Sequence, residues 1–326
     1  MPKKITASAP GKLMLVGGHA VVHGRATVVT SVNQRLFVTV EKNGADVFLL
    51  NAPDLGLTAY SKTIEDLGKK ELPKAVQFVE ILYKRFLEKY PQDHGIVVTT
   101  KSDFSASFGF GSSSAVTVAF AKALTTLYDL SFSKEELFEM CYQTVLEVQG
   151  VGSGYDIASA IWGGTLRYVK PAKVVEPIQT SKLPLVVGYT GVKADTPTLV
   201  RMVDSRLAKN PEKYNQLFDE IGKTASKVQM ALEQNNIDQL GQAFNTHQSL
   251  MRKIGVSSSK LEDLISASLD AGAVGATLSG AGGGDCMIAV VAEEKRIAVE
   301  KAIQRAGGEV MTVGLGEEGV RVESKK

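Results

Sequence analysis

Glycine gathers in three short segments of this chain, and each of them adjoins an apolar strand or helix. The chain has 326 residues and 31 glycines, and the three segments are Gly109–Ser114, Gln149–Tyr155 and Ser279–Gly284. Glycine lets a backbone turn tightly and approach another group closely. These segments therefore predict three tight turns at the ends of regular elements, and the fold has to place them where that freedom is needed.

Hydrophobic spacing predicts strands early in the chain and mostly helices later. Asn43-Gly44, between two predicted strands, is a hairpin signal. Ser133 and Glu136 form a capping-box pattern at a helix start. The polar stretch 201–254 has helical spacing with one break, at Asn235-Asn236. The predicted strands are 26–32, 36–40, 47–50, 95–101, 183–189, 286–291 and 309–313, and the other predicted helices are 74–90, 112–130, 133–148, 261–271 and 293–306.

This order of elements predicts an α+β fold with two lobes, which we expect to span residues 1–180 and 181–326. The 37 basic and 35 acidic residues give a net charge of +2, too balanced to predict a nucleic-acid partner. Two cysteines and four histidines favour neither a disulfide scaffold nor a zinc site. No apolar run approaches the roughly 20 residues that span a bilayer, and the N-terminus lacks a signal peptide, so we expect a cytoplasmic protein.

The segment Gly109-Phe-Gly-Ser-Ser-Ser114 leads directly into a predicted helix. A helix N-terminus offers free N–H groups and a positive dipole end, and here glycines and hydroxyls are added. This combination predicts a phosphate site, although a tight turn with a serine cap would have the same sequence. Ser279–Gly284 has four glycines in five positions and lacks the spacing of a Walker A loop.

Three segments together resemble the motifs of the GHMP kinase superfamily, in the same order along the chain. They are Ala9-Pro-Gly-Lys-Leu through His19-Ala-Val-Val-His-Gly24, Gly109-Phe-Gly-Ser-Ser-Ser114, and Leu278-Ser-Gly-Ala-Gly-Gly-Gly-Asp285. The resemblance implies an N-terminal lobe related to ribosomal protein S5 domain 2 and a ferredoxin-like C-terminal lobe. ATP would lie in the groove between them.

The resemblance also implies roles for individual residues in phosphoryl transfer. Asp156 would accept the proton of the substrate hydroxyl, and Lys12 beside it would lower the pKa of that carboxylate. The residues expected to bind ATP are Gly109, Gly111, Ser112, Ser113 and Ser114, with Ser113 also touching Mg²⁺, and Gly280, Gly282 and Gly283 would stabilise the nucleotide-bound conformation. The substrate-side candidates are His19, Lys193 and Thr196.

Within the superfamily, residues 10–24 are most similar to mevalonate kinases. This similarity implies ATP-dependent phosphorylation of mevalonate to mevalonate 5-phosphate, in isoprenoid precursor biosynthesis. Two positions depart from that pattern: Gly18 stands in place of a Glu, and Val145 in place of the usual magnesium-binding Glu. The nearest acid, Glu147, is offset by two residues, which on a helix points to roughly the opposite face.

Two other functions stay open at the level of sequence. The segment Gln149–Ala160 with Gly163-Gly164 resembles phosphomevalonate kinases, whose acceptor carries an extra dianion and needs additional cations. The candidate cations are Arg25, Arg35, Lys193 and Arg201. The second alternative is a nucleotide-binding protein of the same fold without catalysis. The resemblance also leaves a homodimer open.

Overall fold

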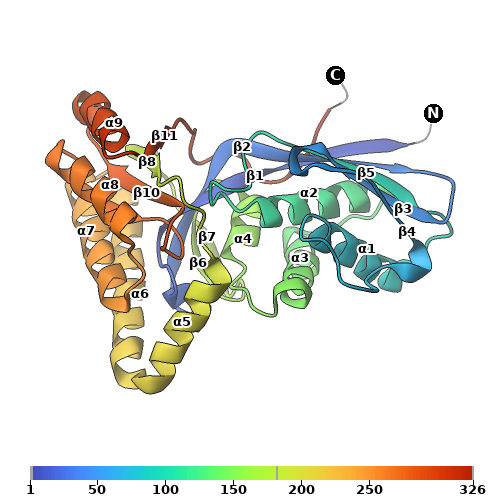
Figure 1. Ribbon diagram of the computed structural model, residues 1–326, viewed down its shortest axis with the longest axis horizontal. Helices are drawn as coiled ribbons and strands as arrows, with labels where there is room; N and C mark the ends of the chain where they lie inside the picture. Colours follow the sequence, from blue (N-terminus) through green and yellow to red (C-terminus); the bar gives the residue numbers. More distant parts are fainter. Residues whose placement is uncertain (1–2, 181–182, 325–326) are drawn as a thin grey trace.

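The computed structural model describes residues 3–180 and 183–324, which form two lobes side by side (Figure 1). In these residues the first lobe is built on a sheet of eight strands and the second on a sheet of four. Helices cover one face of each sheet. The predicted α+β class with two lobes is confirmed. The predicted boundary falls at residues 181–182, which lie outside the described residues, so its position stays a prediction.

The first sheet is organised around two long antiparallel strands, β1 (Lys4–Val16) and β2 (Thr27–Lys42). The strand order is β12-β1-β2-β5-β3-β4, and β6 pairs with the first part of β2. The remaining strands are β3 (Val47–Ala52), β4 (Leu57–Thr63), β5 (Ile96–Ser102), β6 (Thr165–Val169), β7 (Val174–Pro177) and β12 (Arg321–Val322).

Two expectations about this sheet are wrong. The predicted strands 26–32 and 36–40 are parts of the single strand β2, because Arg35 and Leu36 continue the pairing with β1. Asn43-Gly44 does not close a hairpin between β2 and β3, because β5 lies between them and runs parallel to β3. The Asn43 N–H instead donates to the Gly95 carbonyl (3.2 Å), just before β5.

Four helices pack on one face of this sheet (Figure 1). They are α1 (Gln77–Lys89), α2 (Ser112–Leu127), α3 (Lys134–Gln149) and α4 (Tyr155–Trp162). Helix α2 is the central one, since its Ala, Val, Phe and Leu side chains are buried against β1 and β2. The capping box that the sequence predicts at Ser133 and Glu136 is present at the start of α3.

The second lobe has the antiparallel strand order β11-β8-β10-β9, with helices packed over one face. Its elements are α5 (Thr196–Lys209), α6 (Pro211–Glu233), α7 (Ile237–Ile254), α8 (Ser259–Asp270), α9 (Arg296–Arg305), β8 (Leu185–Tyr189), β9 (Gly275–Leu278), β10 (Cys286–Val290) and β11 (Glu309–Met311). The predicted break at Asn235-Asn236 is confirmed. A second break was missed: Asn210 ends α5 and caps α6, with Pro211 as its first residue.

The chain finally returns to the first lobe, where β12 pairs with β1. Strand β12 thus belongs to the sheet of the first lobe, although its residues fall within the range 181–326 expected for the second lobe. None of the helices in residues 3–180 and 183–324 is long and apolar enough to cross a membrane.

Candidate active site

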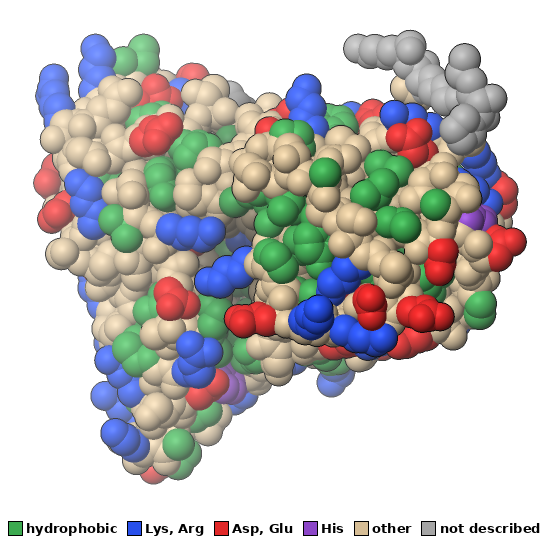
Figure 2. Space-filling view, turned by 45° about the vertical axis from the view of Figure 1, so that its right-hand side comes forward, with side chains coloured by type: hydrophobic (Ala, Val, Ile, Leu, Met, Phe, Trp, Pro, Cys, Tyr) green, Lys and Arg blue, Asp and Glu red, His purple; other side chains and the backbone are tan. Residues whose placement is uncertain are grey.

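A cavity of about 830 Å³ lies between the lobes, and all three glycine-rich segments contribute to its wall. Figure 2 shows a hollow where the two lobes meet, with Lys and Arg side chains beside it. The cavity brings together residues that are far apart in sequence, including Lys12, Ser113, Asp156, Lys193 and Gly280. Its volume is in the range of small-molecule sites.

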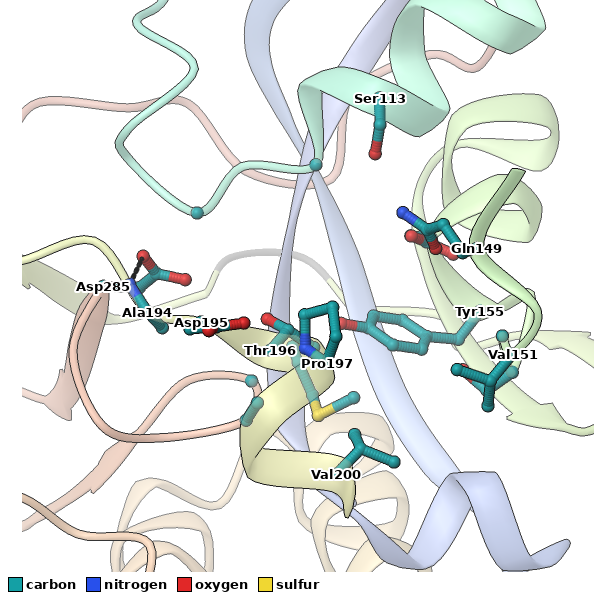
Figure 3. Close-up of a pocket in the computed structure, with 18 of the residues that line it drawn as sticks. Ser113, Gln149, Val151, Tyr155, Ala194, Asp195, Thr196, Pro197, Val200 and Asp285 are labelled. Carbon is teal, nitrogen blue, oxygen red and sulfur yellow. Dashed lines mark hydrogen bonds between the residues drawn. The ribbon is translucent and has the colours of Figure 1, made fainter. Parts of the chain in front are cut away.

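The N-terminus of α2 opens into this cavity. The N-cap is Gly111 in the left-handed conformation (φ 74°), and no side chain caps the helix. Ser112 and Ser113 line the cavity, and the Ser113 side chain points into it (Figure 3). The free N–H groups and the dipole of a 16-residue helix make this end of α2 chemically suited to an anion.

Helix α4 also begins at the cavity without a side-chain cap, and its N-cap is Gly154 (φ 83°). Asp156 lies in its first turn and lines the cavity. Its carboxylate accepts a hydrogen bond from the Ser114 hydroxyl (2.7 Å) and one from the Ile157 N–H (3.1 Å). Ser114 is buried and does not line the cavity, so its contact with Asp156 is what connects it to the site.

Lys12 reaches the same cavity from β1. Its ammonium donates to the Gly109 carbonyl (2.8 Å) and lies 5.6 Å from the centre of the Tyr155 ring. Burial would lower the pKa of Lys12, but Tyr155, Asp156 and Asp285 act in the opposite direction, and the pKa lies above its ordinary value. Lys12 is therefore a buried cation at neutral pH, close to the carboxylate of Asp156.

The substrate-side candidates line the cavity at different depths. His19 is buried, and its Nε2 is 2.9 Å from the Ala281 carbonyl. Burial lowers the pKa of His19, so its ring is neutral at neutral pH. Lys193 and Thr196 are exposed and lie at the wall formed by the start of α5.

The last glycine segment lines the cavity with its first three residues, Ser279, Gly280 and Ala281. Gly282 and Gly283 pack away from it, against Val256 and Leu199, with left-handed φ values of 81° and 73°. A Cβ at Gly282 would clash with the Val256 carbonyl, so these two glycines fix the path of the loop.

The two departures from the mevalonate kinase pattern have clear structural positions. A Cβ at Gly18 would clash with the carbonyl oxygen of Gly280, so the backbone here leaves no room for a longer side chain. Val145 is buried in the core of the first lobe. Glu147 pairs with Arg85 (2.9 Å) and Lys84 (3.6 Å) on α1 and is absent from the cavity wall.

Two cavity residues were missed as candidates. Tyr155 precedes Asp156 and directs its hydroxyl toward the middle of the site (Figure 3). Asp285 follows the last glycine segment and accepts a hydrogen bond from the Ala194 N–H (2.9 Å). The signal for both was adjacency: each directly adjoins a residue or motif that the sequence had singled out.

Comparisons with known proteins agree with this architecture. The profile of the GHMP kinases N terminal domain matches residues 76–164, and that of the GHMP kinases C terminal matches residues 229–309. Mevalonate kinase from Pyrococcus abyssi is 35% identical over 99% of each chain. Mevalonate kinase from Archaeoglobus fulgidus is 33% identical over 89% of this chain and 93% of that protein.

Solved structures share the same fold at lower identity. The Lin0012 protein from Listeria innocua has a TM-score of 0.87 at 21% identity, covering 99% and 100% of the two chains. The Methanococcus jannaschii mevalonate kinase has a TM-score of 0.80 at 23% identity, covering 96% and 98%. The solved structures show that the fold is shared. The sequence identity with the two mevalonate kinases, which extends over nearly the whole chain, also shows the family. The chain belongs to the GHMP kinase superfamily and, within it, to the mevalonate kinase family.

Proposed function

We propose that this protein transfers the γ-phosphoryl group of ATP to the 5-hydroxyl of mevalonate. The main observation behind this proposal is that Lys12 and Asp156 line the same cavity. Helices α2 and α4 both begin at this cavity without a side-chain cap. Support for the proposal also comes from a family membership that extends over the whole chain.

In this mechanism Asp156 accepts the proton of the acceptor hydroxyl. The Ser114 hydroxyl and the Ile157 N–H hold the carboxylate in place. The Lys12 ammonium stabilises the negative charge that develops on the attacking oxygen. Most of the remaining catalysis is positioning and charge neutralisation, as in other phosphoryl transfers.

The nucleotide phosphates would lie at the N-terminus of α2. Ser112, Ser113 and the backbone of Gly109 and Gly111 form that part of the wall. No cluster of three or more His, Cys, Asp or Glu suited to a metal occurs within the described ranges. Mg²⁺ in kinases is often held by few protein ligands plus substrate phosphates, so the Ser113 hydroxyl fits as a ligand. When bound, Mg²⁺ would neutralise phosphate charge.

The positions of the arginines favour mevalonate over mevalonate 5-phosphate as the acceptor. Arg25 pairs with Asp219 (3.0 Å), Arg35 is buried against Ser8 and the C-terminal segment, and Arg201 bonds the Thr198 hydroxyl. None of the three lines the cavity. The phosphate of mevalonate 5-phosphate would have Lys74 and Lys193 at the cavity wall but none of these arginines.

Replacement of Asp156 tests this mechanism. Asp156→Asn keeps the size of the side chain and removes the base, so we expect ATP binding to persist and turnover to fall by at least about 10²-fold. ADP release and equilibrium ATP binding are the two measurements. Lys12→Met should also impair turnover. Turnover near the wild-type rate in Asp156→Asn would refute the role of Asp156, and persistent ATP binding without turnover in the wild type would support the non-catalytic alternative.

A further inference from the structure

Asp285 occupies a backbone conformation that would suit glycine better. Its φ is 54°, in the left-handed region that few non-glycine residues adopt. Three consecutive glycines, 282–284, precede it, and a fourth at position 285 would remove this strain. We therefore expect the contacts of Asp285 to compensate for the free-energy cost of this left-handed backbone conformation.

On one side, Asp285 holds the loop 190–194 of the second lobe. Its N–H donates to the Val192 carbonyl (2.7 Å), and its own carbonyl accepts from the Thr190 N–H (2.9 Å) and hydroxyl (3.0 Å). Its carboxylate accepts from the Ala194 N–H, the bond drawn as a dashed line in Figure 3. The loop that carries Lys193 to the cavity is thus tied to this single residue.

On the other side, the Asp285 side chain packs against Gly109 of the first lobe, in the segment Gly109–Ser114 proposed to bind phosphate (the phosphate segment). A Cβ on Gly109 would lie 2.7 Å from Cγ and Oδ2 of Asp285, so the contact depends on glycine. The carbonyl of the same Gly109 accepts the Lys12 ammonium at 2.8 Å. Gly109 therefore lies between Asp285 and Lys12.

Charge connects the same residues. The charged or titratable groups that face Lys12 are Tyr155, Asp156 and Asp285, and those that face Asp285 are Lys12, Lys193 and the adjacent Cys286. Burial raises the pKa of Asp285, while the Ala194 N–H, Lys12 and Lys193 oppose that change. Asp285 and Asp156 are the two carboxylates that oppose the desolvation of Lys12.

We propose that Asp285 is a positioning residue for phosphoryl transfer, which fixes the Gly109 peptide and supplies negative charge that keeps the Lys12 ammonium at the reacting centre. This proposal rests on the proposed kinase function. It adds Asp285 to Asp156 and Lys12, the two residues whose catalytic roles the family resemblance implies. The loop 190–194, the phosphate segment and Lys12 then form one unit across the two lobes.

Two substitutions separate the charge of Asp285 from its structural contacts. Asp285→Asn keeps a side-chain oxygen that can accept the Ala194 N–H but removes the negative charge. Asp285→Gly relieves the backbone strain and removes both the accepting oxygen and the charge. We expect kcat to fall by at least about tenfold in each variant. The KM for ATP should change by less than about threefold, and Asp285→Asn should melt within about 3 °C of the wild type. Asp263→Asn, at an exposed position on α8, is the matched control with unchanged kcat.

The protonation of Lys12 gives a readout that does not depend on the acceptor. Competitive labelling with acetic anhydride across pH, followed by mass spectrometry of the Lys12 peptide, measures its titration directly. Loss of the Asp285 charge should move the Lys12 midpoint down by at least about half a pH unit. A kcat within twofold of the wild type, or an unmoved midpoint in Asp285→Asn, would overturn the proposal. If the wild type fails to phosphorylate mevalonate, the proposed function fails, and the labelling still decides the coupling of Asp285 to Lys12.

Discussion

His247 is fully buried on α7, and its Nε2 connects the second lobe to the first. Nε2 accepts the Gly17 N–H (3.1 Å), so Nδ1 carries the proton and donates to the Thr277 hydroxyl (2.7 Å). No motif in the sequence includes this histidine. Its partners come from β9 and from the turn after β1, which no local pattern could pair.

This environment predicts a specific dependence of stability on pH. Burial lowers the pKa of His247 to about 3, so below pH 6.5 the unfolded chain binds a proton that the folded chain does not. The stabilisation is complete above pH 6.5 and is lost as the pH falls toward 3, by about 1.4 kcal/mol per pH unit.

Urea unfolding of the wild type and of His247→Gln at pH 7 and pH 5 measures this effect. The variant should have a lower free energy of unfolding than the wild type at pH 7. At pH 5 this difference in unfolding free energy should be smaller by about 2 kcal/mol. His94→Gln is the control, because the His94 ring bonds Asp93 near the surface. A gap of the same size at both pH values would contradict the account.

At the scale of elements, the turn after β1 and the last glycine segment are fitted to each other. The Ser279 hydroxyl donates to the Met14 carbonyl (2.9 Å), and His19 bonds the Ala281 carbonyl. Gly18 lies between these contacts, with its Cα facing the Gly280 carbonyl. The φ of Gly18 is not in the left-handed region, so its backbone conformation does not require glycine. The close approach of the Gly280 carbonyl is what requires it.

Gly18→Ala and Gly18→Glu test this packing. Either side chain should displace Gly280 from the cavity wall, raise the KM for ATP and cost about 1–3 kcal/mol of unfolding free energy. Thermal unfolding and initial rates at varied ATP are the measurements. If Gly18→Glu kept both at wild-type values, the loop would be free to move and the interpretation of Gly18 would be wrong.

Elements with local signals were predictable from sequence, and those that depend on distant pairing were not. The start of α3 followed from Ser133 and Glu136, and the start of α2 at Ser112 followed from glycines and serines placed before an apolar run. The Asn43-Gly44 signal failed because β5, some 50 residues later, inserts beside β2. Asp285 escaped notice because one of its partners, Ala194, lies 91 residues earlier in the chain and the other, Gly109, belongs to the opposite lobe.

At the scale of the whole molecule, Arg35 fastens the C-terminal segment onto the first lobe. It is 6% exposed and donates to the Ser8 hydroxyl and carbonyl and to the carbonyls of Glu318 and Gly319, at 2.7–3.0 Å. The same segment continues into β12, which pairs with β1, the strand that carries Lys12. The chain thus crosses between the lobes a second time.

Arg35→Met should therefore cost at least about 2 kcal/mol of unfolding free energy, because it leaves several buried carbonyls without donors. Arg25→Met is the control, and its half-exposed pair with Asp219 should contribute less than about 1 kcal/mol. Denaturant unfolding of both variants gives the comparison. Equal losses would mean that the C-terminal segment is held by its strand pairing alone.

The central claim concerns the acceptor, and a coupled ADP-release assay with Mg-ATP tests it most directly. Mevalonate and mevalonate 5-phosphate are supplied in parallel to the protein. We predict turnover on mevalonate and none above background on the phosphorylated compound. Turnover only on mevalonate 5-phosphate would contradict the account and make the Gln149–Ala160 segment the better guide to the substrate.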